Sequence, residues 1–169
     1  MKRSFTSPSP ISVSRPPSLH SGLLYNTHMP TYQIPPELAP CGIYCGACPS
    51  LGKTCLGCAS QERGGLQKRK SKWGCKLRIC CYEEKGLAFC SECEEFPCPK
   101  HRKKLVDSHP DDPRFQYRRD VPENLILLKE LGKEDYIQFM TEKYTCPHCG
   151  GQVVWYDYRC RDCGVEVLV

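Results

Sequence analysis

The amino-acid sequence predicts a small metal-stabilised α+β protein with a Cys-rich zinc-knuckle domain, a two-helix segment and a C-terminal β zinc ribbon. Three observations predict this fold class. Fifteen of the 169 residues are cysteine, and five pairs of them have the spacing C-x2-C. Fifteen prolines and 13 glycines interrupt most apolar runs, so no large aliphatic core is expected. The hydrophobic pattern becomes helical only between residues 120 and 144.

The cysteine count and the N-terminus bear on the cellular compartment. Fifteen is odd, so a complete disulfide framework would leave one thiol unpaired. The N-terminus lacks the apolar region of a secretory signal, and no run approaches the roughly 20 apolar residues of a membrane span. We therefore expect a cytoplasmic protein without a membrane segment, whose thiols bind metal. A secreted disulfide scaffold is the alternative.

Residues 1–37 are predicted to be a disordered tail. They are rich in Ser and Pro and contain no acidic residue before Glu37. The prolines would break the amphipathic helix that an organellar transit peptide needs. Met29 is an alternative start of synthesis, because it lies just before the Cys-rich part.

Residues 38–109 are predicted to form the Cys-rich metal-binding domain. Eleven cysteines fall within residues 41–98, interleaved with glycines, so long helices do not fit between the ligands. We expect metal knuckles, short strands and one short helix at residues 79–85. The stretch at residues 59–74 holds five basic residues without apolar periodicity and is predicted to be an exposed loop.

Residues 110–144 are predicted to hold a polar linker and two short helices. Asp120 and Glu123 have the spacing of a capping box at the start of the first helix. Gly132 is predicted to end that helix. The second helix is expected at residues 133–143, where apolar side chains recur with helical period. We expect both helices to serve packing.

Residues 145–169 are predicted to form a zinc ribbon. Two C-x2-C motifs, each followed by Gly, are separated by ten residues rich in strand-forming Val, Trp and Tyr. Four thiolates fill the tetrahedral shell of one zinc ion, which makes the site structural rather than catalytic. The predicted ligands are Cys146, Cys149, Cys160 and Cys163. His148 lies inside the first knuckle but is not needed as a ligand.

Several blocks of the Cys-rich part occur together in a known family. They are Cys41-Gly-Ile-Tyr-Cys45-Gly-Ala-Cys48-Pro, Cys55-Leu-Gly-Cys58, the single Cys75 and Cys80, and Lys85-Gly-Leu-Ala-Phe-Cys90-Ser-Glu-Cys93-Glu-Glu-Phe-Pro-Cys98. Over residues 38–105 the chain resembles the Cys-rich family called domain of unknown function 3795, and its helices and ribbon resemble those of longer members. The resemblance implies a small prokaryotic-type protein that holds zinc and has no established activity.

Ten of the eleven clustered cysteines are candidate metal ligands. Cys81 is left out, because it falls where the family has another residue, and it is expected to be a free thiol. His101 is either a further ligand, three residues after Cys98, or an ordinary exposed histidine. The pairing of the cysteines into sites is left open. The predicted ligands of several zinc ions in this part are Cys41, Cys45, Cys48, Cys55, Cys58, Cys75, Cys80, Cys90, Cys93 and Cys98.

The basic residues of the Cys-rich part have two interpretations. Residues 41–109 contain 13 Lys and Arg against 7 Asp and Glu. Zinc ions held by four thiolates are negative overall and would cancel most of this excess. Alternatively, the segment from Lys68 to Trp73 would contact nucleic acid through its charges and its aromatic ring. The predicted partner is a protein or a nucleic acid, and the oligomeric state is left open.

The sequence favours a non-catalytic zinc-binding module of unknown physiological role. It contains no G-x-S-x-G, H-E-x-x-H or phosphate-binding glycine loop. An iron–sulfur redox protein is the first alternative, because four thiolates suit iron–sulfur clusters and zinc alike. The motif Cys41-x3-Cys45-x2-Cys48 has the spacing of radical S-adenosylmethionine enzymes but lacks their aromatic residue and their barrel. A thiol-based sensor using Cys81 or another surplus cysteine is the second alternative.

Overall fold

Short helices and one small sheet make up the regular structure of residues 33–168, the part of the chain that the computed structural model describes. The α-helices are α1 (Lys76–Arg78), α2 (Pro99–Lys104), α3 (Val121–Leu131) and α4 (Lys133–Lys143). Strands β1 (Val153–Val154) and β2 (Arg159–Cys160) pair antiparallel, with Val153 opposite Cys160. Short 3-10 helices lie at Cys45–Ala47, Lys70–Lys72, Cys90–Glu92, Val106–Ser108 and Pro113–Arg118.

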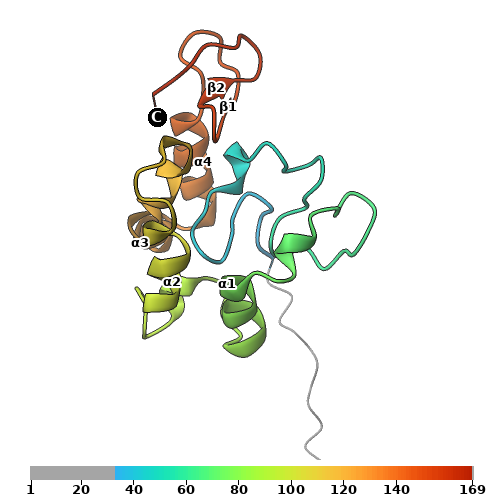
Figure 1. The fold of residues 1–169 in the computed structure, drawn as a ribbon, viewed down its shortest axis with the longest axis vertical. Helices are drawn as coiled ribbons and strands as arrows, with labels where there is room; N and C mark the ends of the chain where they lie inside the picture. Colours follow the sequence, from blue (N-terminus) through green and yellow to red (C-terminus); the bar gives the residue numbers. More distant parts are fainter. Residues whose placement is uncertain (1–32, 169) are drawn as a thin grey trace, which may run out of the picture.

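This mixture of helices with a two-stranded antiparallel sheet confirms the coarse fold class. Figure 1 shows the sheet at one end of the molecule, beside the end of α4, and α1 at the opposite end. The first part of the Cys-rich segment, which includes the 3-10 helix Cys45–Ala47, lies between them, and this 3-10 helix contacts α4. Most of the predicted tail, including the alternative start at Met29, falls outside the described residues.

The two predicted helices form where the sequence places them. Gly132 has φ of +83°, a backbone conformation that glycine adopts readily, and it separates α3 from α4. The capping box is wrong. Asp120 precedes α3, but its side chain accepts no capping hydrogen bond and lies instead 3.9 Å from Nζ of Lys143.

The short helix expected at residues 79–85 has an unusual form. It begins as α1 and continues as a π-helical segment, Ile79–Glu84. The backbone N–H of Lys85 donates to the carbonyl of Cys80, five residues earlier. π-helical turns are rare and occur frequently at functional sites. This one carries the adjacent Cys80 and Cys81.

An aromatic core joins the Cys-rich segment, the helices and the ribbon. The rings of Tyr117 and Trp155 stack with their centres 4.2 Å apart and their planes 1° from parallel. The backbone N–H of Trp155 donates to the carbonyl of Ala47 at 3.1 Å. The same cluster of buried side chains includes Leu125 from α3 and Tyr136 from α4. Sequence reasoning underestimated this interior, because it counted aliphatic residues and gave no weight to the tyrosines.

Gly42 shows how closely the Cys-rich segment approaches α3. Its φ is +88°, and a Cβ there would lie 2.5 Å from Cγ of Leu125 and 2.9 Å from Cγ1 of Val121. Only glycine fits this position. The glycine that follows Cys41 in the first cysteine motif is therefore needed for packing.

We expect Trp155→Ala to lower the free energy of unfolding of the metal-loaded protein by about 3–5 kcal/mol, because it removes a large buried ring from the aromatic stack. Chemical denaturation followed by circular dichroism measures this change. Phe139→Ala is the control, because the Phe139 side chain on α4 is 44% exposed and its loss should change stability by less than about 0.5 kcal/mol. Equal effects of both substitutions would contradict the assigned core.

Candidate metal centres

The structure gathers the fifteen free cysteines into three groups. The ribbon group is Cys146, Cys149, Cys160 and Cys163. The six-cysteine cavity is lined by Cys41, Cys45, Cys48, Cys55, Cys58 and Cys75. The five-cysteine cavity is lined by Cys80, Cys81, Cys90, Cys93 and Cys98. The sequence left the grouping of the ten predicted ligands in the Cys-rich part open. The structure places six of them in one cavity and four in the other, with Cys81 beside the four.

The ribbon group has the geometry of a single-ion site. Its four Sγ atoms all lie within 4.8 Å of one another. The Sγ atoms of Cys146 and Cys163 are 3.7 Å apart, and those of Cys149 and Cys160 are 3.4 Å apart. Zn–S bonds of about 2.3 Å would place tetrahedral sulfurs about 3.8 Å apart. The four thiols could therefore hold one metal ion without rearrangement. His148 is exposed and does not belong to the group.

Two copies of one backbone turn bring these thiols together. The carbonyl of Cys146 accepts from the N–H of Gly150, and the carbonyl of Cys160 accepts from Gly164 in the same way. The N–H of each cysteine in turn donates to a carbonyl five residues on, that of Gly151 or Val165. Both turns need a glycine with positive φ, +75° at Gly150 and +73° at Gly164. The repeated C-x2-C-G sequence thus encodes the repeated turn.

Backbone N–H groups favour the thiolate form of Cys160. The hydrogen bond from the N–H of Cys163 lowers the pKa of Cys160 most, burial works against it, and the N–H of Asp162 adds to the lowering. The resulting pKa is about 7. A thiol of this kind gives up its proton to a metal ion readily near neutral pH.

The six-cysteine cavity has a volume of about 210 Å³ and a basic wall. Nη1 of Arg69 lies 3.7 Å from Sγ of Cys48 and donates to it. Positive charge next to thiolates stabilises them and a negative metal–thiolate group. The basic residues that line the cavity are Arg69, Lys72, Lys104 and Arg118.

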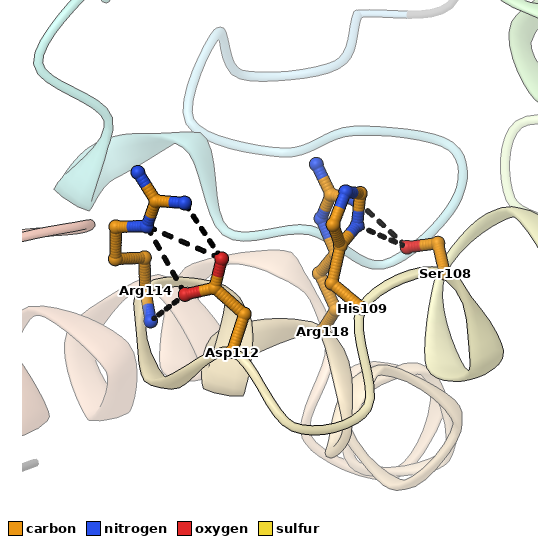
Figure 2. Close-up of polar contacts among 5 residues, drawn as sticks. All are labelled: Ser108, His109, Asp112, Arg114 and Arg118. Atoms are coloured by element: carbon orange, nitrogen blue, oxygen red, sulfur yellow. Dashed lines mark hydrogen bonds and ion pairs between the residues drawn. The ribbon is translucent and has the colours of Figure 1, made fainter.

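Arg118 is held in this wall by the segment shown in Figure 2. Its Nη1 donates to Oγ of Ser108 at 2.8 Å and lies 3.3 Å from Nδ1 of His109. On the same segment, Nη2 of Arg114 forms an ion pair with Asp112 at 2.7 Å. The connection between α2 and α3 therefore positions one cation of the cavity.

Burial and mutual repulsion oppose ionisation of the thiols in this cavity when no cation is bound. Burial raises the pKa of Cys41 and of Cys45 well above the usual value, and the charge of the Cys58 thiolate raises both further. Burial also raises the pKa of Cys58 to about 12, with a contribution from Cys75. A bound cation would reverse this balance by replacing the protons.

The five-cysteine cavity has a volume of about 180 Å³ and lies between the π-helical segment and the residues 90–98. Nζ of Lys85 donates to Sγ of Cys93 at 3.0 Å and forms an ion pair with Glu95 at 2.9 Å. The hydrogen bond from Lys85 lowers the pKa of Cys93, and the N–H of Glu95 contributes to the same shift. Sequence reasoning missed Lys85, although it stands in one of the family-like blocks.

Cys81 differs from the other thiols of the five-cysteine cavity. It is 3% exposed, and its Sγ lies 3.3 Å from the carbonyl oxygen of Leu87, to which it donates. A carbonyl only accepts, so the Cys81 thiol carries its proton in this contact. Cys81 also forms a hydrogen bond with the thiol of Cys90, so its exclusion from the ligands stays a prediction.

His101 does not lie on the surface of the protein. Its side chain is fully buried, and its Nε2 donates to the carbonyl of Cys41 at 2.9 Å. Burial lowers its pKa, so the ring is neutral. The prediction of an ordinary exposed histidine is wrong. His101 instead ties α2 to the first cysteine motif.

The basic stretch at residues 59–74 is exposed only in part. Lys72 is buried, and its Nζ donates to the carbonyl of Ser60 at 2.6 Å. The ring of Trp73 has cations over it, with Arg63 at 4.0 Å, Lys72 at 4.5 Å and Arg78 at 4.7 Å from its centre. Part of the charge that the sequence placed on the surface is therefore used inside the fold.

Comparison of the chain with protein-family models, with curated proteins and with solved structures finds no match in any of the three. The resemblance to domain of unknown function 3795 thus stays a prediction. No helix within residues 33–168 is long and apolar enough to cross a membrane.

We expect Gly151→Ala to abolish metal binding at the ribbon. A Cβ at this position would lie 2.9 Å from Sγ of Cys160 and would also meet the Asp162 carboxylate, so the ligand sulfur would have to move. Zinc content after dialysis measures the loss. Gly150→Asn is the control, because no atom lies within 4 Å of its Cβ and Asn tolerates positive φ. Full zinc retention in Gly151→Ala would contradict this geometry.

Proposed function

We propose that this chain is a non-catalytic zinc-binding module whose ribbon holds one structural Zn²⁺ through Cys146, Cys149, Cys160 and Cys163. The observation that carries this proposal is the approach of four Sγ atoms to within 4.8 Å of one another. Four thiolates leave no coordination position for water or a substrate, and a catalytic zinc ion needs such a position. The ribbon ion therefore has a structural role.

The ribbon ion would also position the rest of the protein. Nε2 of Gln152 donates to the carbonyl of Gly46, and Nη2 of Arg161 donates to the carbonyl of Cys48 at 3.4 Å. Both acceptors lie in the first cysteine motif of the Cys-rich part. A metal ion that fixes the two knuckles thus fixes the contacts between the ribbon and the neighbouring cavity.

We propose a protein rather than a nucleic acid as the partner of this module. Three cationic groups lie over the Trp73 ring, on which a nucleic-acid base would have to stack. A cavity of about 820 Å³ lies between the Cys-rich segment, α4 and the ribbon. Its wall combines apolar side chains, such as Leu51 and Ile137, with a few charged ones, such as Glu37 and Arg161, so it offers both apolar and charged contacts to a protein segment.

The thiol-sensor alternative is not favoured. A reactive sensor cysteine is accessible and has a lowered pKa. Cys81 is buried and engaged with the carbonyl of Leu87. The iron–sulfur alternative rests on other observations, which concern the two cavities.

Substitution of one ribbon ligand tests the proposal. Cys160→Ser should reduce the zinc content by one ion per chain, whereas His148→Ala, in the same ribbon but outside the thiol group, should leave it unchanged. Replacement of the ribbon zinc by Co²⁺ should give the visible spectrum of tetrahedral tetrathiolate cobalt, and added azide should not alter it. A spectrum that responds to azide would reveal an open coordination position and contradict a structural site.

A further inference from the structure

We propose that the six-cysteine and five-cysteine cavities each hold a [4Fe–4S] cluster, so that zinc is confined to the ribbon. This inference deepens the proposed metal-binding function and depends on it only in that thiolates bind metal. It differs from the prediction that zinc occupies every cysteine site of the chain. It rests on the spacing of the thiols, the size of the cavities, the number of available ligands and the surrounding charges.

The spacing of the thiols separates the cavities from the ribbon. A single tetrahedral ion draws all its ligand sulfurs into mutual contact, as the ribbon group illustrates. Among residues 33–168, the ribbon is the one group in which three or more candidate ligand atoms lie within 4.8 Å of one another. The thiols of the two cavities are gathered around a space instead. In a cubane cluster each thiolate binds a different iron atom, so the ligand sulfurs stand farther apart.

The size of the cavities points the same way. Their volumes are about 180 and 210 Å³, whereas a cavity of about 10–15 Å³ by this measure already holds one water molecule. A lone zinc ion bound by four sulfurs would fill little of either space. A cluster of four iron and four sulfide atoms is an occupant of more suitable size.

The five-cysteine cavity offers the number of ligands that one cluster needs. The Cys81 thiol donates a hydrogen bond to the carbonyl of Leu87, and a metal-bound thiolate has no hydrogen to donate. This leaves four thiols for the four iron atoms. The cluster ligands assigned here are Cys80, Cys90, Cys93 and Cys98. The six-cysteine cavity offers at least four ligands as well.

Both cavities have cations placed to stabilise a negative cluster. A [4Fe–4S]²⁺ core with four thiolates carries a net negative charge, and hydrogen bonds to its sulfurs influence its reduction potential. Lys85 provides such a bond to Cys93, and Arg69 provides one to Cys48. Lys100 also stands in the wall of the five-cysteine cavity.

The two cavities are neighbours that share one wall. Leu77, in α1, is 2% exposed and lines both of them. The π-helical segment that follows α1 then carries Cys80 into the second cavity. We therefore place the two clusters on opposite sides of the Leu77 side chain, close enough for their unpaired spins to interact when both are reduced.

The test is metal and sulfide analysis of the full-length protein purified without oxygen. We expect about eight iron atoms, about eight acid-labile sulfides and one zinc ion per chain. Dithionite should donate one electron to each cluster and bleach the visible absorption. The electron paramagnetic resonance signal of the reduced protein should be broadened by coupling between the two clusters.

Variants assign the metals to their sites. Cys93→Ser should lose about half of the iron and sulfide, keep one zinc ion, and give an unbroadened signal from the remaining cluster. Cys81→Ala is the matched control in the same cavity and should keep all the iron. Cys160→Ser should lose the zinc and keep the iron, which distinguishes failure of the ribbon site from failure of the cluster sites.

Zinc in both cavities without labile sulfide would overturn this inference while leaving the ribbon proposal intact. Loss of iron from Cys81→Ala equal to that from Cys93→Ser would overturn the ligand assignment. Iron and sulfide in a protein without ribbon zinc would instead support the clusters and refute the ribbon site.

Discussion

Burial of many thiols, together with the repulsion between their ionised forms, is the constraint on which this structure depends. Burial and neighbouring thiolate charge raise the pKa of Cys41 and Cys45 together, so the ionised group is unfavourable without a cation. The chain nevertheless collects its cysteines into three groups by turns, a π-helical segment and contacts between distant segments. Bound metal ions would supply the positive charge and the directed bonds that make such gathering favourable.

The hydrophobic interior acts together with these groups. Trp155 and Tyr117 stack in the core, and Cys160, a proposed ribbon ligand, is buried in the same cluster. The hydrogen bond from Trp155 to Ala47 joins the ribbon to the first cysteine motif. Ordering one metal group therefore orders the apolar surface on which another rests. The aromatic core is small for a chain of this length, so the stability of the fold depends on metal binding as well as on the core.

Local patterns made part of this structure predictable, and contacts between distant residues account for the rest. The ribbon follows from two C-x2-C-G turns, and α4 follows from the apolar period after Gly132. The division of eleven cysteines into six and five was not predictable, because it depends on how α1 and the residues 90–98 pack. His101 was misjudged for the same reason, since its partner is the carbonyl of Cys41, 60 residues away. Asp120 failed as a cap because its backbone, with φ of −87° and ψ of 8°, lies outside the extended region that an N-cap residue usually adopts.

The most direct test of the dependence on metal is removal of metal from the folded protein. Two-dimensional amide nuclear magnetic resonance spectra should be compared before and after treatment with a strong chelator under reducing conditions. We expect the dispersed amide resonances of the folded protein to collapse to those of an unfolded chain on chelation and to return when metal is restored. A chelated protein that contains no metal and keeps its dispersed spectrum would contradict the central claim.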